Sequence, residues 1–578
     1  MQRKDKRRLN RGKITEPRMK KISHGFTWRG LWPQPKSSRI CSIKKYSSIL
    51  INIQVKRKDA TMKLMELYQD KIMGAIKGLD RIRFRGTLRM LANQNGLRSF
   101  MSYTNILLKD FSGWVENLTG MIRKSCEARA EEFGIETRYL RSIRISKEEL
   151  VRSIAAEKGI KEGSICLFSV VEPCISPIVK GNKASKKLEV VMANRKCVWL
   201  YHYFNHPEFG FGHVRIQSWL PFNVFVCING RHWLERQLQK CGIEYIKDGN
   251  CFPWIEDIEA AQAVMDSQLM TDWSKMLNRL AFDSCPALSQ VLRPLRPEYY
   301  WSADATEWAT DIMFKSTEAL DKLYPSLIHH AMRICDSSSV MKYLGRRSLA
   351  GVASKEVISD YRRRYEGVRV KHWVNHNSVK MYNKSGSILR VETTINNSRE
   401  FKVFRHPDDD KSRPASWQKM RKGVSDLHRR CQVSDKCNER YADALASAQV
   451  EEKLKEVVSP ACNKVKKKGK SYRGLNPWQE EDYKLLAFLA KGEHAINGFR
   501  NKDLRKWLYA KSEAMSKQEQ KRYSGRTTRR IKLLRVHGLV KKVAKENRYI
   551  LTAKGQKFTC ALMSASAIDI KGLTKIAA

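Results

Sequence analysis

The last hundred residues carry the strongest structural signal in this 578-residue chain. Between Asn476 and Ala565, three amphipathic stretches each begin at a residue that can cap a helix, namely Asn476, Asn501 and Ser524. Gly538 then ends the third predicted helix. Two short apolar runs at 540–543 and 548–551 flank a polar loop. The region therefore predicts three helices, a β-hairpin and a last helix capped by Thr552.

This order of elements resembles the winged helix-turn-helix domains that bind DNA. The resemblance implies that the third helix enters a major groove and that the hairpin touches phosphate or the minor groove. The residues that would contact DNA are Ser524, Arg526, Thr527, Arg529, Arg530 and Lys532 on the helix, with Lys545 and Arg548 on the hairpin. Some domains of this kind bind only protein, so that alternative stays open.

The charge balance indicates a polyanionic partner. The chain has 110 basic and 59 acidic residues, a formal net charge of +51 and a pI near 9.9. Basic and aromatic residues are interleaved along the chain, which favours nucleic acid over a membrane surface. Duplex DNA is the partner expected first, with single-stranded DNA and RNA as alternatives. No apolar run is long enough to span a bilayer, no signal segment begins the chain, and the 14 cysteines show no disulfide framework, so we expect a cytoplasmic protein without a membrane partner.

The pattern along the chain predicts a multidomain α+β protein. We expect a helical N-terminal region, a mixed α+β central body with antiparallel sheets and a C-terminal winged helix. The expected segments are a basic arm at 1–60, a helical region at 61–160, an α+β sheet domain at 161–300, a helix with a β-meander at 301–405 that can continue the preceding domain, a helical segment at 406–463, a basic linker at 464–473 and the winged helix at 474–578. Within the helical region, Arg81, Arg83 and Arg85 would share one strand face, either as a phosphate-contacting rib or as a solvated strand edge.

Two groups of side chains could hold a metal ion. If residues 302–311 are helical, one face carries the carboxylates of Asp304, Glu307 and Asp311, which could gather Mg²⁺ or Mn²⁺. The alternative is that acidic residues merely favour the first turns of a capped helix. The second group is histidines, which could instead be structural side chains: His202, His206 and His213.

Residues 378–395 predict a β-hairpin around the turn Lys384-Ser385-Gly386. The expected register pairs Lys380 with Arg390 and Ser378 with Glu392. It places polar side chains on one face and apolar ones on the other. The polar face holds Lys380, Tyr382, Arg390 and Glu392, and the apolar face holds Val379, Met381, Leu389 and Val391.

The run from Lys380 to Lys384, with Tyr382 at its centre, followed by Arg390-Val391-Glu392, resembles the hairpin of rolling-circle replication initiators from plasmids and phages. The resemblance implies that Tyr382 attacks a phosphodiester, that Glu392 helps to hold a metal, and that Lys380 or Arg390 steadies the pentacovalent phosphate. The His-apolar-His pair of many such enzymes is missing. Glu392 would therefore have to bind the metal together with Glu307 or Asp304.

These patterns predict a DNA-binding protein of mobile-element or replication type that cuts or joins DNA by metal-assisted phosphodiester transfer, as a nickase or strand transferase. A non-enzymatic winged-helix regulator or architectural DNA-binding protein is the first alternative. An RNA-binding protein is the second, because strand faces rich in Lys, Tyr and Phe can stack bases. The absence of a Gly-Lys-Ser/Thr phosphate loop disfavours an ATP-driven helicase.

Overall fold

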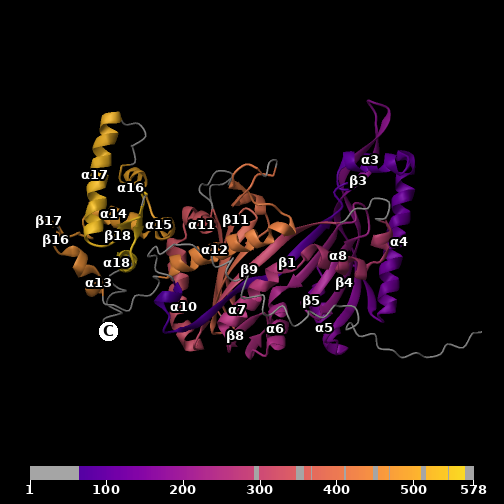
Figure 1. The fold of residues 1–578 in the computed structure, drawn as a ribbon, viewed down its shortest axis with the longest axis horizontal. Coiled ribbons are helices and arrows are strands. Elements are labelled where there is room, and N and C mark those ends of the chain that lie inside the picture. Colours follow the sequence, from indigo (N-terminus) through magenta and orange to yellow (C-terminus); the bar gives the residue numbers. More distant parts are fainter. Residues whose placement is uncertain are drawn as a thin grey trace, which may run out of the picture.

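The computed structural model describes residues 64–291, 299–345, 357–365, 367–408, 412–446, 454–467, 469–509, 516–544 and 546–566. The expected basic arm at 1–60 and Lys545 lie outside the described residues. The described part is mixed α+β, with one 11-stranded sheet and several two-stranded ones (Figure 1). None of the described helices combines the length and the apolar character needed to cross a bilayer.

Two long strands, β1 (Ile72–Thr87) and β9 (Tyr300–Phe314), pair antiparallel at the centre of the large sheet. The strand order is β10-β11-β12-β13-β9-β1-β6-β5-β4-β3-β2. Each central strand is followed by helices and then by a meander whose last strand returns to pair with it. That last strand is β6 (Val224–Asn229) beside β1 and β13 (Ile388–Ile395) beside β9. The sheet is thus built from two similar halves that meet at the β1–β9 pair.

The first half begins with a short helix and contains the longest strands. Its other elements are α2 (Leu64–Leu67), α3 (Gln94–Tyr103), α4 (Phe111–Glu132), β2 (Glu136–Leu140), α5 (Lys147–Glu157), β3 (Gly163–Asn182), β4 (Lys187–His206), β5 (Gly210–Gln217), α6 (Gly230–Cys241), β7 (Tyr245–Asp248), β8 (Cys251–Ile255), α7 (Ile258–Ser267), α8 (Trp273–Ser284) and α9 (Ala287–Val291). Phe84, Val226 and Trp273 belong to one buried cluster between the sheet and these helices. Asn229 starts α6 by accepting hydrogen bonds from the backbone amides of Arg231 and His232.

The second half packs a meander against helices. Its elements are α10 (Thr317–Ile334), α11 (Ser337–Tyr343), β10 (Ile358–Arg364), β11 (Gly367–Val374), β12 (Asn377–Lys384), β14 (Lys402–Arg405), β15 (Ser416–Lys419) and α12 (Leu427–Leu445). The predicted apolar face of the β12–β13 hairpin is confirmed, because Val379, Met381, Leu389 and Val391 are buried in one cluster.

The hairpin register differs from the prediction by two residues. Lys380 lies opposite Glu392, and Tyr382 lies opposite Arg390. A shift of two leaves each side chain on its predicted face, because strand side chains alternate with a period of two.

Two of the helical predictions are wrong. The region at 61–160 contains β1, so Ile72 and Ile76 belong to a strand. Residues 302–311 likewise form part of β9, so Asp304, Glu307 and Asp311 project from a strand. Pairing of β1 and β9 along almost their whole lengths outweighs the local helical spacing, because strand formation depends on the neighbouring strand more than on the segment itself.

The C-terminal unit contains the predicted elements in the predicted order. The predicted elements are α14 (Glu480–Ala490), α16 (Asn501–Leu508), α17 (Lys517–Val536), β18 (Val540–Lys542), β19 (Tyr549–Leu551) and α18 (Ala553–Ser566). The unit also contains α13 (Leu454–Cys462), β16 (Val465–Lys467), β17 (Lys470–Tyr472) and α15 (Gly492–Asn497), which are not among the elements predicted for the winged helix. The expected basic linker at 464–473 contains the β16–β17 hairpin. Three expected caps are wrong. α14 begins after Gln479 rather than at Asn476, and α16 is capped by Arg500 rather than by Asn501. Ser516 with Glu519 caps α17, which leaves Ser524 inside that helix.

Candidate metal centre

A β-bulge in the central strand β1 turns Asp80 towards one face of the sheet. Leu79 pairs with Trp308 and Arg81 with Glu307, so Asp80 is the extra residue between two paired positions. The side-chain amide of Asn250, in the turn between β7 and β8, donates hydrogen bonds to both Asp80 carboxylate oxygens, at 2.6 and 2.7 Å. Asp80 is therefore buried and held in one orientation.

Three carboxylates from three strands meet beside this bulge. An oxygen of Asp80, one of Glu307 on β9 and one of Glu392 on β13 all lie within 4.8 Å of one another. The register brings them together, because Glu392 lies opposite Ala309 and therefore shares a sheet face with Glu307. Carboxylate oxygens are the ligands that Mg²⁺ and Mn²⁺ prefer.

The carboxylates of this group repel one another although cations lie nearby. Burial, and then the neighbouring Glu392 carboxylate, raise the pKa of Glu307 to about 7. Glu307 forms no hydrogen bond or ion pair with another described residue. Glu392 has one cation beside it: Lys380 Nζ lies 2.7 Å from Glu392 Oε1, without the alignment of a hydrogen bond. A divalent cation would relieve the repulsion among the three carboxylates.

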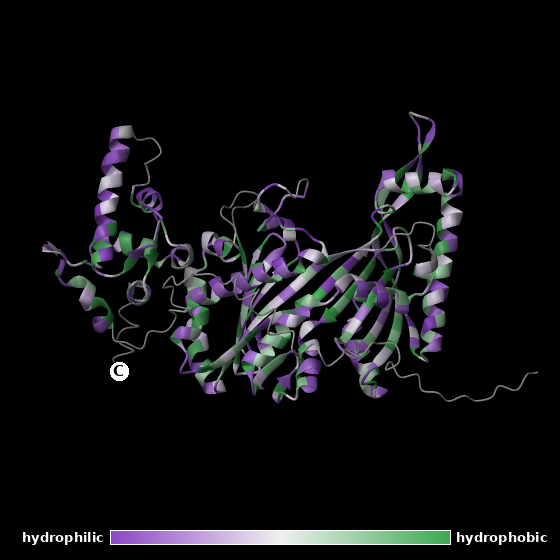
Figure 2. Cartoon of the chain, viewed as in Figure 1, coloured by the Kyte–Doolittle hydropathy of each residue, from purple (hydrophilic) through white to green (hydrophobic). Residues whose placement is uncertain are grey.

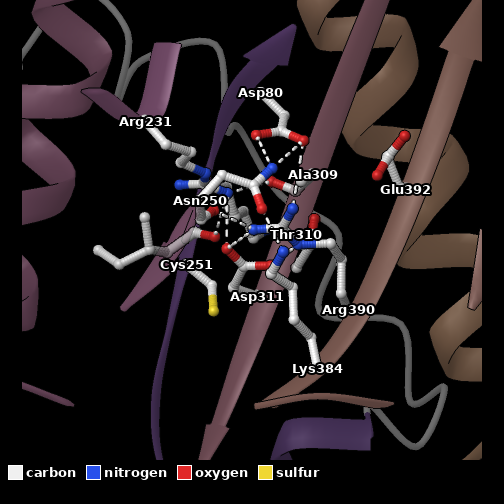
Figure 3. Close-up of polar contacts among 12 residues, drawn as sticks. Asp80, Arg231, Asn250, Cys251, Ala309, Thr310, Asp311, Lys384, Arg390 and Glu392 are labelled. Carbon is white, nitrogen blue, oxygen red and sulfur yellow. Dashed lines mark hydrogen bonds and ion pairs between the residues drawn. The ribbon is translucent and has the colours of Figure 1, made fainter. Parts of the chain in front are cut away.

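Arg390 lies beneath the carboxylate group and links it to Asp311 (Figure 3). Its guanidinium is fully buried, with Nη1 3.2 Å from Asp80 Oδ2 and Nη2 donating to Asp311 Oδ2 at 2.7 Å and to the Asn250 carbonyl at 2.6 Å. Arg231 Nη2 lies 3.1 Å from the same Asp311 oxygen. Burial alone would raise the pKa of Asp311, but Arg390 and Arg231 hold it below its ordinary value. Asp311 is thus bonded to two arginines, and Arg390 positions Asp80.

Tyr382 orients one of the carboxylates. Its hydroxyl donates a hydrogen bond of 3.0 Å to Glu392 Oε2, and its side chain is 5% exposed. Burial, and then the Glu392 carboxylate, raise the pKa of Tyr382 well above its ordinary value. In this arrangement the hydroxyl holds its proton and faces a carboxylate.

The structure therefore brings together five of the residues proposed from sequence, Lys380, Tyr382, Arg390, Glu392 and Glu307, and adds Asp80. Arg390 was expected to steady a phosphate, but its guanidinium is fully buried among carboxylates. Asp304 lies farther along β9, where its carboxylate is 2.7 Å from Arg83 Nη2. Sequence reasoning missed Asp80, although one signal was present: an acidic residue stands between Leu79 and the alternating arginines of a strand-like run.

The three histidines proposed as metal ligands occupy structural positions. The ring nitrogens of His202 contact the hydroxyls of Ser284 and Ser164 at 3.1 and 2.9 Å. Burial lowers the pKa of His202 to about 4, and those of His206 and His213 to about 3. Within the part of the chain that the structure describes, the set with metal-ligand spacing is the carboxylate group instead.

The residues expected to contact DNA on α17 divide into exposed and internal ones. Arg526, Arg529 and Lys532 are exposed. Thr527 is buried, with its hydroxyl donating to the Tyr523 carbonyl at 2.9 Å, and Arg530 Nη1 lies 3.0 Å from Asp482 Oδ1. Two others contact side chains nearby: the hydroxyl of Ser524 donates to the Asn501 side chain, and Arg548 pairs with Glu546.

Comparison with known protein families, with curated proteins and with solved structures finds no match to this chain. An assignment of function therefore depends on the geometry of the carboxylate group and of the surfaces around it.

Proposed function

We propose that this protein is a DNA-binding enzyme of mobile-element or replication type that cuts or transfers DNA phosphodiesters with a divalent cation. The observation that carries the proposal is the meeting of Asp80, Glu307 and Glu392, with Lys380 beside them, on one face of a large sheet. Two of the three carboxylates are buried and none of them belongs to a solvated surface run.

A bound Mg²⁺ or Mn²⁺ would polarise a phosphate oxygen and lower the pKa of a bound water. Lys380 would place a positive charge beside the phosphate that approaches the carboxylates. Lys371 lies directly opposite Lys380 on β11, and burial followed by the charge of Lys380 lowers its pKa to about 8. Two neighbouring lysines next to a cation site suit an anionic substrate.

The surroundings of Tyr382 favour water over tyrosine as the nucleophile. A tyrosine that attacks phosphate must lose its proton and reach the phosphorus atom. Tyr382 is buried, and its hydroxyl donates a hydrogen bond to Glu392. In this proposal Tyr382 is a positioning residue for Glu392, and the reaction is hydrolysis.

The C-terminal unit supplies duplex binding in this proposal, as a winged helix. Support comes from α17 followed by the β18–β19 hairpin, with Gly538 at φ 75° between them. Figure 2 shows α17 as hydrophilic along most of its length. The exposed Arg526, Arg529 and Lys532 would then meet the groove and its phosphates.

The test incubates the full chain with supercoiled, linear and single-stranded DNA, with and without Mg²⁺ or Mn²⁺, and measures nicks and covalent protein–DNA adducts. Asp80→Asn and Glu307→Gln should lose cleavage and keep DNA binding. Asp304→Asn is the matched control, because it removes a carboxylate from the same strand β9 at a position paired with Arg83. Cleavage at the wild-type rate by Glu307→Gln would refute the metal centre. Tight binding by the wild type without cleavage in either ion would favour a regulator.

A further inference from the structure

Strands β3 and β4 continue past the large sheet as a two-stranded arm, defined here as residues 171–198. β2 pairs with β3 only as far as Val170, and β5 pairs with β4 only from Trp199 onwards. Between these points β3 and β4 pair with each other and with no other described strand. At about 3.3 Å per residue the arm is roughly 40 Å long. Figure 1 shows its end projecting beyond α3.

The end of the arm carries positive charge that no acidic side chain neutralises. Four exposed lysines surround the turn, and none of them forms an ion pair with another described residue: Lys180, Lys183, Lys186 and Lys187. The one acidic residue nearby, Glu189, accepts a hydrogen bond of 2.8 Å from the side-chain amide of Asn182. The arginines in the middle of the sheet differ, because Arg81 and Arg83 pair with Glu148 and Asp304.

The turn at the end of the arm is narrow and ordered by its own hydrogen bonds. Asn182 Oδ1 accepts hydrogen bonds from the backbone amides of Ala184 and Ser185, at 2.9 and 3.3 Å. Gly181, Ala184 and Ser185 have small side chains that keep the end slim. A preformed turn loses little conformational entropy on binding.

We infer that this arm binds duplex DNA by entering its major groove, with the four lysines on the flanking phosphates. The major groove of B-DNA is about 12 Å wide and about 8.5 Å deep and admits a two-stranded β-ribbon. The major groove of A-form RNA is too narrow for one. The shape and charge of the arm therefore favour duplex DNA over RNA.

The arm also prolongs the sheet face that holds the carboxylate group. In the strand register, Lys180 lies opposite Glu189 and Lys187 lies opposite Asn182. These lysines therefore lie on the same sheet face as Glu172. Register through β4, β5 and β6 connects that face to Arg83 and Glu307. The inference rests on the proposed function for its choice of DNA. It adds a second duplex contact at the opposite end of the molecule from α17, and both elements project to the same side in Figure 1.

The test measures binding of the full chain to a short duplex without divalent cation, as a function of salt concentration. The arm variant replaces Lys180, Lys183, Lys186 and Lys187 with alanine. The control makes the same charge change at exposed lysines on the body: Lys240, Lys275, Lys315 and Lys322. Each phosphate contact contributes about 0.9 to the slope of log affinity against log salt, so the arm variant should reduce the magnitude of that slope by about 3.6 and the control by less than about 1. Equal losses in the two variants, or none in the arm variant, would overturn the inference.

A second comparison tests the ligand class. Double-stranded RNA and single-stranded DNA of the same length should bind the arm variant about as well as the wild type, whereas duplex DNA should bind it at least about tenfold more weakly at physiological salt. An equal loss of affinity for all three nucleic acids would contradict the inference that the arm enters the major groove of duplex DNA. These measurements use no cation, so they stand whether or not the chain cleaves DNA. Failure of the cleavage proposal shows separately, as intact DNA binding by a wild type that makes no nicks.

Discussion

Two tyrosine–glutamate pairs lie on the same face of the sheet, one in each half, and they have opposite charge balance. In the first half, the Tyr201 hydroxyl lies 2.9 and 2.8 Å from the two carboxylate oxygens of Glu172. Lys147 Nζ is 3.2 Å from that carboxylate, and Arg215 Nη2 is 2.5 Å away. In the second half, the Tyr382–Glu392 pair has Lys380 as its close cation and two further carboxylates within 4.8 Å.

The difference separates a structural pair from a candidate ligand. Glu172 is surrounded by two cations that neutralise it, so burial is compensated within the protein. Asp80, Glu307 and Glu392 lie within 4.8 Å of one another, and repulsion from Glu392 helps to raise the pKa of Glu307. Lys380 contacts Glu392, and Arg390 keeps Asp80 in that arrangement. A protein that maintains such repulsion destabilises its folded state unless a cation binds there.

Cleavage should distinguish the two glutamates most strongly. Glu392→Gln removes a proposed metal ligand and should lower the rate of metal-dependent nicking by about 10²-fold to 10³-fold, comparable to the loss of one electrostatic stabiliser of a transition state. Glu172→Gln should stay within about twofold in the same assay at a temperature where both variants are folded. Equal losses would show that the comparison has no functional meaning.

The free energy of unfolding should fall when Glu172 is replaced and rise when Glu307 is replaced. Glu172→Gln leaves Lys147 and Arg215 without their buried partner and should lower the free energy of unfolding by about 3 kcal/mol. Glu307→Gln removes a repelled carboxylate and should raise it by about 1 kcal/mol in the absence of metal. Urea unfolding with EDTA present measures both. A stabilised Glu172→Gln variant would contradict the structural reading of that pair.

Replacing Tyr382 and replacing Tyr201 should have effects on Mn²⁺ affinity that differ by about tenfold. Tyr382→Phe removes the hydrogen bond that orients Glu392 and should weaken Mn²⁺ binding by about 10-fold, as loss of an outer partner of a metal ligand does. Tyr201→Phe should leave Mn²⁺ binding unchanged. A covalent protein–DNA adduct that disappears in Tyr382→Phe would instead make Tyr382 the nucleophile, as the hairpin resemblance implied.

The last prediction concerns the dependence of stability on pH. The folded-state pKa of Glu307 is about 7, above its ordinary value of 4.5. Between these values the folded state keeps a proton that the unfolded state has released, so the contribution of Glu307 to stability falls as pH rises through the window. The metal-free protein should lose on the order of 3 kcal/mol between about pH 4.5 and pH 7 from this group. Saturating Mg²⁺ should restore the lost stability above pH 7. The free energy of unfolding of Glu307→Gln should lack this dependence on pH.

Local patterns predicted the hairpins and the C-terminal helices well and the central strands poorly. The turn at Ser385-Gly386 and the alternation around Tyr382 are short-range signals, so they placed Lys380 and Glu392 on one face correctly. β9 has helical spacing among its acids, and its strand conformation depends on β1, more than 200 residues earlier in the chain.

The sequence predicted those residues of the candidate site that local spacing identifies, and it missed those that depend on pairing between distant strands. Glu307, Lys380, Tyr382 and Glu392 were singled out by type and spacing. Asp80 required the bulge, which is a property of the β1–β9 pairing and is invisible in the segment alone. Arg231 was equally hidden, because its contact with Asp311 depends on the packing of α6 against the sheet.

The three carboxylates come from positions 80, 307 and 392, which sets a time order during synthesis of the chain. A ribosome has produced Asp80 long before it reaches Glu392, and the intervening residues include the whole of β9. A nascent chain, or one cut by a protease between Glu307 and Glu392 and separated, holds an incomplete ligand set. The ligand set is therefore complete only after synthesis has reached the end of β13.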